Sequence, residues 1–267
     1  MNKTSIKSEN YIRIKNQGSL SFGGDQSWFS NNAAGRDGTI AKYGCGVIAA
    51  ADLLLYIARS RENCATALLA GEIPRREDIE RAQYEHFLRN LSRHALRPLP
   101  PFGLMGSAVA ACVNRRFCEC RVRLRSEWRF FALMSKPLEA IREQLSRDIP
   151  VIMTIPPFPL KINSLLLARE LPCGDAPSAA VRYNARSGHF VTAVALHEQK
   201  GAITLEISSW GRRYYIDWCE YLAALRSPVG ALACGMVSVK DTERLQRVVE
   251  MRVNATPCDA AKHEEHR

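Results

Sequence analysis

Residues 42–56 read KYGCGVIAAADLLLY. Cys45 lies between Gly44 and Gly46, and a strongly apolar run begins directly behind it. This run predicts a mostly buried central helix over about residues 47–60, with the cysteine at its first turn. Unpaired backbone N–H groups at a helix N-terminus favour an anion, so such a position can lower a thiol pKa from about 8.5 into the reactive range. The glycines leave room around the sulfur. The same stretch also fits a small buried residue that caps a core helix.

The composition is that of an ordinary globular protein. The chain has 267 residues, of which 46% are hydrophobic and 24% charged, which is enough for one large domain or two small ones. No apolar run approaches the ~18 residues of a membrane span, and residues 1–20 contain no secretory signal. The 9 cysteines are scattered, form no CxxC pair and show no zinc-site spacing. We therefore expect free thiols in a reducing compartment, the cytoplasm, and no membrane span.

The net charge of +10 raises the alternative of a nucleic-acid-binding protein. The segment that most favours this alternative is residues 115–125, which read RRFCECRVRLR. Alternation in this segment predicts a half-buried strand with arginines on its solvated face. No recognised nucleic-acid motif accompanies the segment, so we interpret it as a basic surface and do not expect nucleic acid as a partner.

Along the chain, helices are expected before strands. Beyond the central helix, the pattern predicts helices at 62–70, from Pro74 to the proline-rich break at 98–101, and at 103–114, 137–148 and 217–225. It predicts strands at 11–15, 150–155, 189–196, 202–207, 213–216 and 233–240, and no firm structure at 160–185. Helices followed by antiparallel strands are typical of the α+β class. We expect a leader at 1–20, one domain at 21–240 and a polar tail at 241–267.

His189 is the histidine best placed for chemistry. The sequence GHFV from Gly188 places it at the first residue of an apolar strand, where a rigid sheet would hold it at an edge. A cysteine nucleophile needs such a base within hydrogen-bond reach, a group that orients the base and donors for an oxyanion. A solvated strand-end histidine is the alternative. The other histidines are expected on a solvated helix face (His86, His94), at a turn (His197) and in the tail (His263, His266).

A third segment completes a recognisable set. Residues 205–216 read LEISSWGRRYYI, a strand that ends in hydroxyl residues, a tryptophan and a glycine. Together with Gly44-Cys45-Gly46 and Gly188-His189-Phe190-Val191, it resembles papain-like cysteine peptidases, and most closely the bacterial bacteriocin-processing (double-glycine) branch. The order of the motifs and the separation of cysteine and histidine both match, over roughly residues 23–218.

The resemblance implies a papain-like fold and a thiol hydrolase that cleaves peptide or isopeptide amide bonds in a peptide or protein substrate. No metal or cofactor is implied. Carried over residue by residue, the resemblance assigns these roles: nucleophile Cys45, base His189, oxyanion donor Gln26, shielding Trp210, orienting Ser208, and flanking Gly44 and Gly188.

Two departures from the family pattern leave alternatives open. Ser208 stands where the family usually has Asn or Asp, and its shorter side chain orients an imidazole less firmly; Asp217 is the rival orienting group. Gln26 also precedes Cys45 by a longer interval than usual, so the residues between them would have to loop out. An acyltransferase with the same acyl-enzyme chemistry and a degenerate peptide-binding relative therefore remain alternatives to the hydrolase.

Overall fold

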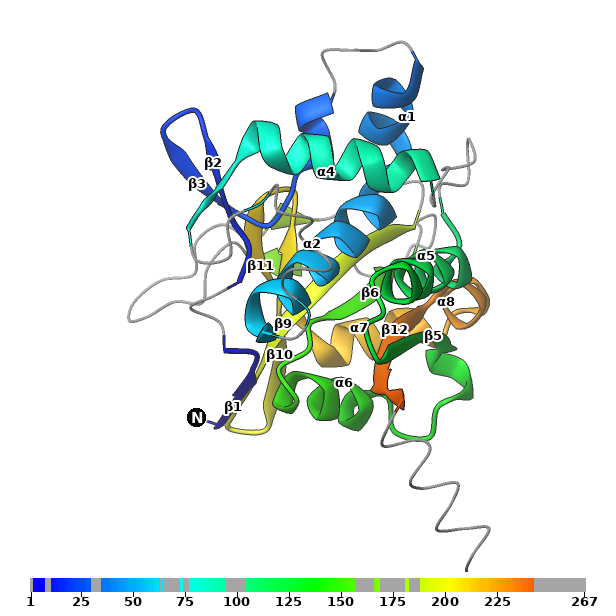
Figure 1. Cartoon of the computed structure of the whole chain (residues 1–267). Coiled ribbons are helices and arrows are strands. Elements are labelled where there is room, and N and C mark those ends of the chain that lie inside the picture. The colour runs from blue at the N-terminus through cyan, green and yellow to red at the C-terminus, as the bar shows by residue number, and fades with distance from the viewer. Residues whose placement is uncertain are drawn as a thin grey trace, which may run out of the picture.

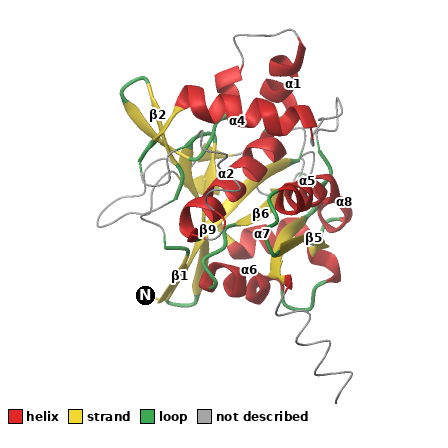
Figure 2. Cartoon of the chain, viewed as in Figure 1, coloured by secondary structure: helices red, strands yellow, loops and turns green. Residues whose placement is uncertain are grey.

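The computed structural model describes residues 2–7, 11–29, 35–62, 64, 73, 77–94, 104–156, 166–168, 181–182 and 188–242. In these residues helices lie against a largely antiparallel sheet, so the α+β class is confirmed (Figures 1 and 2).

The main sheet of the described residues is antiparallel. Its strands are β1 (Asn2–Ser5), β5 (Leu124–Phe130), β6 (Val151–Ile155), β7 (Leu166–Ala168), β8 (Val181–Arg182), β9 (His189–Gln199), β10 (Ala202–Ser209), β11 (Arg212–Asp217) and β12 (Gly235–Asp241). Their order is β5-β12-β6-β9-β10-β11-β7-β8, and β1 pairs with β9. A small second sheet contains β2 (Arg13–Asn16), β3 (Ser19–Phe22) and β4 (Ile79–Glu80), with β2 and β4 parallel.

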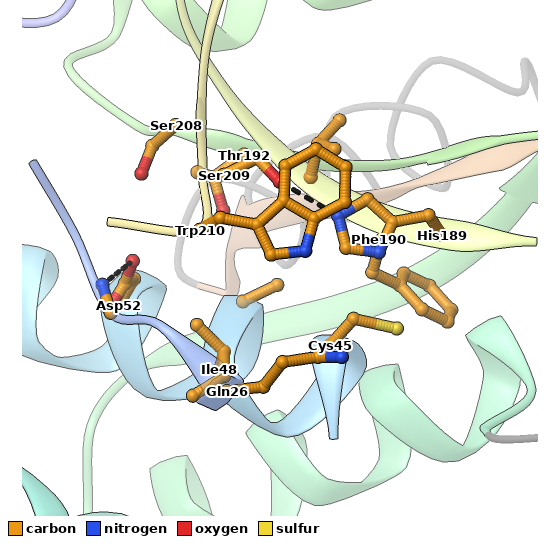
Figure 3. A pocket seen from close by; sticks show the side chains of 13 residues that line it. Gln26, Cys45, Ile48, Asp52, His189, Phe190, Thr192, Ser208, Ser209 and Trp210 are labelled. Atoms are coloured by element: carbon orange, nitrogen blue, oxygen red, sulfur yellow. Dashed lines mark hydrogen bonds between the residues drawn. The ribbon is translucent and has the colours of Figure 1, made fainter. Parts of the chain in front are cut away.

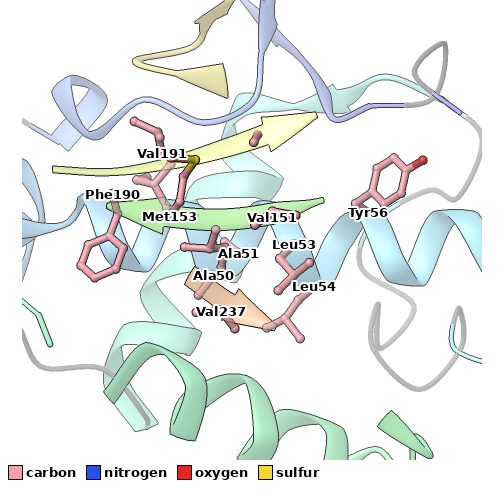
Figure 4. Close-up of a cluster of buried hydrophobic side chains, with 14 of the residues drawn as sticks. Ala50, Ala51, Leu53, Leu54, Tyr56, Val151, Met153, Phe190, Val191 and Val237 are labelled. Atoms are coloured by element: carbon pink, nitrogen blue, oxygen red, sulfur yellow. The ribbon is translucent and has the colours of Figure 1, made fainter. Parts of the chain in front are cut away.

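Helix α2 (Cys45–Ser60) is the central helix, as its apolar sequence predicts. Its side chains from Gly46 to Ala58 are buried, and it packs on β9 and β6 with α4 (Arg81–His94) and α5 (Gly106–Glu119) beside it (Figure 1). Figure 4 shows Leu53 and Leu54 of this helix within the core. Burial of each such leucine stabilises the folded state by about 1.5–3 kcal/mol. This packing holds α2 against the sheet and so determines where its N-terminus lies.

The remaining helical elements surround the sheet. They are the 3-10 helices η2 (Gln26–Phe29) and η3 (Phe131–Leu133) and the helices α1 (Gly35–Tyr43), α6 (Pro137–Ser146), α7 (Trp218–Leu225) and α8 (Pro228–Ala233). Pro137 begins α6 as the sequence predicts, and Ser227 caps α8 by accepting a hydrogen bond from the Gly230 backbone N–H.

The predicted arginine-striped strand is wrong. Helix α5 continues to Glu119, and β5 begins only at Leu124. Arg115 and Arg116 pair with Glu119 at helical spacing, and the residues buried along α5 also recur at helical spacing. The alternation of apolar and charged residues in 115–125 suggests one continuous strand. In the structure, α5 ends within this segment, so the alternation does not belong to a single element. The continuous cationic strand face that motivated the nucleic-acid alternative is therefore not formed.

The helix predicted to open at Pro74 begins at Arg81 instead. Ile79 and Glu80 pair with β2 as a short strand, and Asp78 forms an ion pair with Arg13. The acidic residues before the helix thus tie it to the small sheet. The predicted helix at 62–70 and the irregular stretch at 160–185 lie mostly outside the described residues.

The N-terminal residues join the sheet structure. Residues 2–5 pair with β9 as β1, and residues 13–16 form β2. β12 ends at Asp241, and the predicted tail lies almost wholly outside the described residues. In the part of the chain that the structure describes, no single helix has the length and apolarity of a membrane span; α1 and α2 meet those criteria only as a pair, bent by 93°.

Candidate active site

Cys45 is the first residue of α2, and its two glycines allow tight packing on either side. The Gly44 N–H donates to the Ile40 carbonyl at 2.8 Å, and a side chain at Gly44 would collide with that carbonyl. A Cβ at Gly46 would lie 3.1 Å from the Phe190 ring. The glycines thus let the end of α1 and the start of β9 pack closely at the first turn of α2, while Cys45 between them is only partly buried and lines a pocket.

Burial raises the pKa of the Cys45 thiol above its ordinary value. The backbone N–H groups of Phe190, Gly46 and Cys45 itself act in the opposite direction, because they stabilise the thiolate. The helix N-terminus therefore provides the expected donors, but the packing that brings them also removes water. The resting group is a neutral thiol, which differs from the lowered pKa that the sequence indicates.

His189 begins β9 and is buried. Its Nε2 lies 2.7 Å from the Ser209 Oγ, and its ring stacks on the Trp210 indole with centroids 4.3 Å apart and planes 10° apart. Burial lowers the pKa of His189 to about 3, so the imidazole is neutral near pH 7. A neutral imidazole carries one nitrogen that can accept a proton, which is what a general base requires.

The sequence predicts that Ser208 orients His189, but in the structure the neighbouring Ser209 makes this contact. The Ser208 hydroxyl donates to the Phe22 carbonyl at 2.7 Å, on the side of the sheet that faces α2. Successive side chains in a strand point to opposite faces, so only one of the two serines can reach the histidine. The register of β10 against β9 pairs Ser208 with Thr192, and this leaves Ser209 on the face of His189.

Gln26 begins η2 and lines the same pocket as Cys45. Its Nε2 donates to the Ala41 carbonyl of α1 at 3.1 Å, and its buried Oε1 has no hydrogen-bond partner among the residues that the structure describes. The carboxamide nitrogen carries two N–H groups, so the bond to Ala41 orients it and leaves a second donor. Helix α1 occupies much of the interval between Gln26 and Cys45 that the sequence predicts to loop out.

Figure 3 shows how the pocket brings the elements together. The first turns of α2 form one wall, the start of β9 and the end of β10 form the other, and the segment before η2 lies between them. Cys45, His189, Gln26, Ser208 and Trp210, all named from the sequence, line it. Gly188 is exposed, directly before β9.

Sequence reasoning missed three polar residues of the pocket, Asp52, Thr192 and Ser209. Asp52 is the one charged residue in the apolar run 46–58, and a buried carboxylate there is itself a signal of special function. Ser209 could be separated from its neighbour only by knowing the strand register.

Two other histidines are placed away from the pocket. His86 contacts Asn90 on the solvated side of α4. His197, predicted at a turn, is a buried residue within β9, and its Nε2 lies 2.8 Å from the Glu206 carboxylate. β9 runs on to Gln199, so the turn begins later than predicted.

Comparison with family models, with curated proteins and with solved structures finds no match to this chain. Within the described ranges, no group of three or more His, Cys, Asp or Glu residues could hold a metal ion. The chemistry of the pocket is therefore the basis for assigning a function.

Asp217, the rival orienting group, caps α7 instead. Its carboxylate accepts a hydrogen bond from the Glu220 backbone N–H at 2.9 Å. We expect Asp217→Ala to lower the free energy of unfolding by about 0.5–2 kcal/mol, as loss of an N-cap does, in urea titrations. The same variant should leave the reactivity of Cys45 unchanged within twofold; a larger loss would show that Asp217 supports His189.

Proposed function

We propose that this chain is a papain-like thiol hydrolase that cleaves peptide or isopeptide amide bonds through an acyl-enzyme. One observation carries the proposal: Cys45 at the N-terminus of a core helix and His189 at the start of a sheet strand line one pocket, where Ser209 and Trp210 flank the imidazole. The resemblance of the three sequence motifs supports the same assignment. Location in the cytoplasm stays a prediction.

In the first half-reaction, Cys45 attacks the substrate carbonyl. His189 takes the thiol proton on Nδ1, since Nε2 is engaged with Ser209, and the sulfur–carbon bond forms as the carbonyl oxygen gains negative charge. The Cys45 backbone N–H and the second N–H of Gln26 are the donors proposed for that oxyanion. The carbon–nitrogen bond then breaks, the amine leaves with the proton from His189, and a thioester remains.

In the second half-reaction, His189 removes a proton from water, and the hydroxide attacks the thioester carbonyl. The carbon–sulfur bond breaks, the acid product leaves, and Cys45 regains its proton. An amine in place of water would give acyl transfer by the same steps.

A non-catalytic peptide-binding relative is the second candidate, and one observation favours it. Burial moves the pKa of Cys45 up and that of His189 down, so the resting site is not a thiolate–imidazolium pair. A catalytic site of this kind works only if His189 acts as a general base at the moment of attack.

Acylation by p-nitrophenyl acetate tests the proposal because it requires both attack on a carbonyl and stabilisation of an oxyanion. We expect release of p-nitrophenolate from the native full-length chain, with the acetyl group mapped to Cys45 by mass spectrometry. Cys118 and Cys219 are exposed thiols and serve as internal controls. Acetylation of these residues with none at Cys45 would overturn the hydrolase proposal and favour the binding relative.

A further inference from the structure

Asp52 is a buried carboxylate that the proposed acylation steps do not use. It lies on α2, about two helical turns after Cys45, and is 2% exposed. Its Oδ1 accepts the Tyr84 hydroxyl at 2.7 Å, and its Oδ2 accepts the Tyr11 hydroxyl at 3.2 Å. The Gly24 backbone N–H lies 3.1 Å from Oδ2 and 3.3 Å from Oδ1. Groups from three separate parts of the chain thus converge on one carboxylate.

The segment next to Asp52 can pass there only because it is glycine. Gly23 has a φ of +82°, and a Cβ on it would lie 2.5 Å from the Asp52 Oδ2 and collide with the Ser208 hydroxyl. A Cβ on Gly24 would collide with the Tyr84 hydroxyl. The backbone is therefore pressed against the carboxylate, and its position depends on the hydrogen bonds made there.

The same short segment is held on its other sides. The Gly23 N–H donates to the Ile12 carbonyl at 2.8 Å, and the Gly24 carbonyl accepts from the Gly211 N–H at 3.0 Å. Ser208 donates to the Phe22 carbonyl. Gln26 lies two residues after Gly24, with Asp25 between them, so the hydrogen bonds that hold Gly23 and Gly24 restrict where its carboxamide enters the pocket (Figure 3).

We propose that Asp52 is a positioning residue of the thiol site, acting through Gly24 to hold Gln26 where it can donate to the oxyanion. The inference rests on the proposed function. Asp52 itself does not touch the reacting atoms.

The electrostatics are consistent with a functional role. Burial raises the pKa of Asp52 to about 6, while the bonds from Tyr84, Gly24 and Tyr11 lower it only partly. The ionised carboxylate therefore stabilises the fold less than the protonated form would, although it accepts hydrogen bonds from Tyr84, Gly24 and Tyr11.

The surrounding ionisable groups do not titrate in the same range. The pKa values of Tyr11 and Tyr84 are raised well above their ordinary value, so both remain donors, and Asp25 contributes to that rise at Tyr84. Across the pocket, Cys45 and His189 stay neutral between about pH 5 and 7. Protonation of Asp52 as the pH falls through about 6 weakens the charge-assisted bond to Gly24.

Two reagents separate this role from a general effect on the thiol. p-Nitrophenyl acetate reacts through a tetrahedral oxyanion, whereas iodoacetamide loses iodide from a saturated carbon without forming one. We expect Asp52→Asn to lower the Cys45 acetylation rate by about tenfold at pH 7.5, less than outright loss of an oxyanion donor, and to change alkylation by less than about twofold. Glu206→Gln, which alters a buried carboxylate elsewhere in the sheet, is the matched control and should change neither rate.

The pH dependence of Cys45 acetylation and a double-mutant cycle between Asp52 and Gln26 give two further tests. Neither result is expected if Asp52 only stabilises the fold. Wild-type acetylation should fall as the pH drops through about 6, and Asp52→Asn should lack that change. In a Gln26→Ala background, Asp52→Asn should have less than about a twofold effect, because its route to the oxyanion is already removed.

The outcomes are distinct. Equal acetylation rates in wild type and Asp52→Asn, or parallel losses with both reagents, would overturn the positioning role and leave the hydrolase proposal intact. A wild type that is never acetylated at Cys45 overturns both. If Asp52→Asn does not fold, Tyr84→Phe removes the shortest of the bonds to Asp52 and should lower acetylation alone, by about threefold; no selective loss in that variant also overturns the role.

Discussion

Replacing His189 with alanine should lower the rate of Cys45 acetylation at pH 7 by about 10²- to 10⁴-fold, the usual contribution of a positioned general base. The loss is expected to be large because burial leaves Cys45 as a neutral thiol, whose proton must be removed during attack. The measurement is p-nitrophenolate release under single-turnover conditions, corrected with a Cys45→Ala variant.

The pH dependence makes this prediction specific. Because burial lowers the pKa of His189 to about 3, the base form persists throughout the range from pH 7 to 8, above the range in which Asp52 is protonated, and wild-type acetylation should change little there. Without the imidazole, only the thiolate reacts, so the rate of His189→Ala should rise about tenfold per pH unit up to the raised thiol pKa.

His86→Ala is the matched control, since this histidine lies on the solvated side of α4, and it should retain wild-type rates. A His189→Ala variant with the wild-type rate and profile at pH 7 would mean that the histidine is structural and that the chain is not a thiol hydrolase of this kind.

The central helix and the strand that carries His189 could be predicted because their signals are local. The apolar run behind Cys45 is too continuous for a surface helix, and β9 follows Gly188 as an apolar run. Because both α2 and β9 are buried, the positions of their first residues, Cys45 and His189, are determined by core packing. The nearness of Cys45 and His189 followed from the family resemblance, since neither run contains information about the other.

Features set by tertiary packing could not be predicted in the same way. The pKa of Cys45 depends on its burial and on backbone N–H groups such as that of Phe190 on another element, and both are properties of the assembled structure. The choice between Ser208 and Ser209 depends on strand register, where a one-residue shift exchanges the faces. Asp52 was visible as a charge in an apolar helix, but its partners come from distant segments.

Ser209→Ala should lower the acetylation rate of Cys45 by about five- to 150-fold, which corresponds to the roughly 1–3 kcal/mol lost when a buried group is left without its partner. The Ser209 Oγ lies 2.7 Å from His189 Nε2, so in the active tautomer Nε2–H donates to the hydroxyl and Nδ1 is left to accept the thiol proton. Without the hydroxyl, the ring keeps its stacking on Trp210 but loses the hydrogen bond that selects this tautomer.

Ser209→Thr is the conservative variant, because it keeps the hydroxyl and suits a strand; it should restore acetylation to within a few-fold of wild type. Ser208→Ala tests the position that the sequence favoured. Ser208 bonds to the Phe22 carbonyl and not to His189, so its loss should be smaller than that of Ser209→Ala. The reverse ranking would show that Ser208 orients the histidine in the working protein. Equal, negligible effects of both would mean that neither hydroxyl is needed to orient the ring, because each variant removes one of them and leaves the stacking on Trp210 in place.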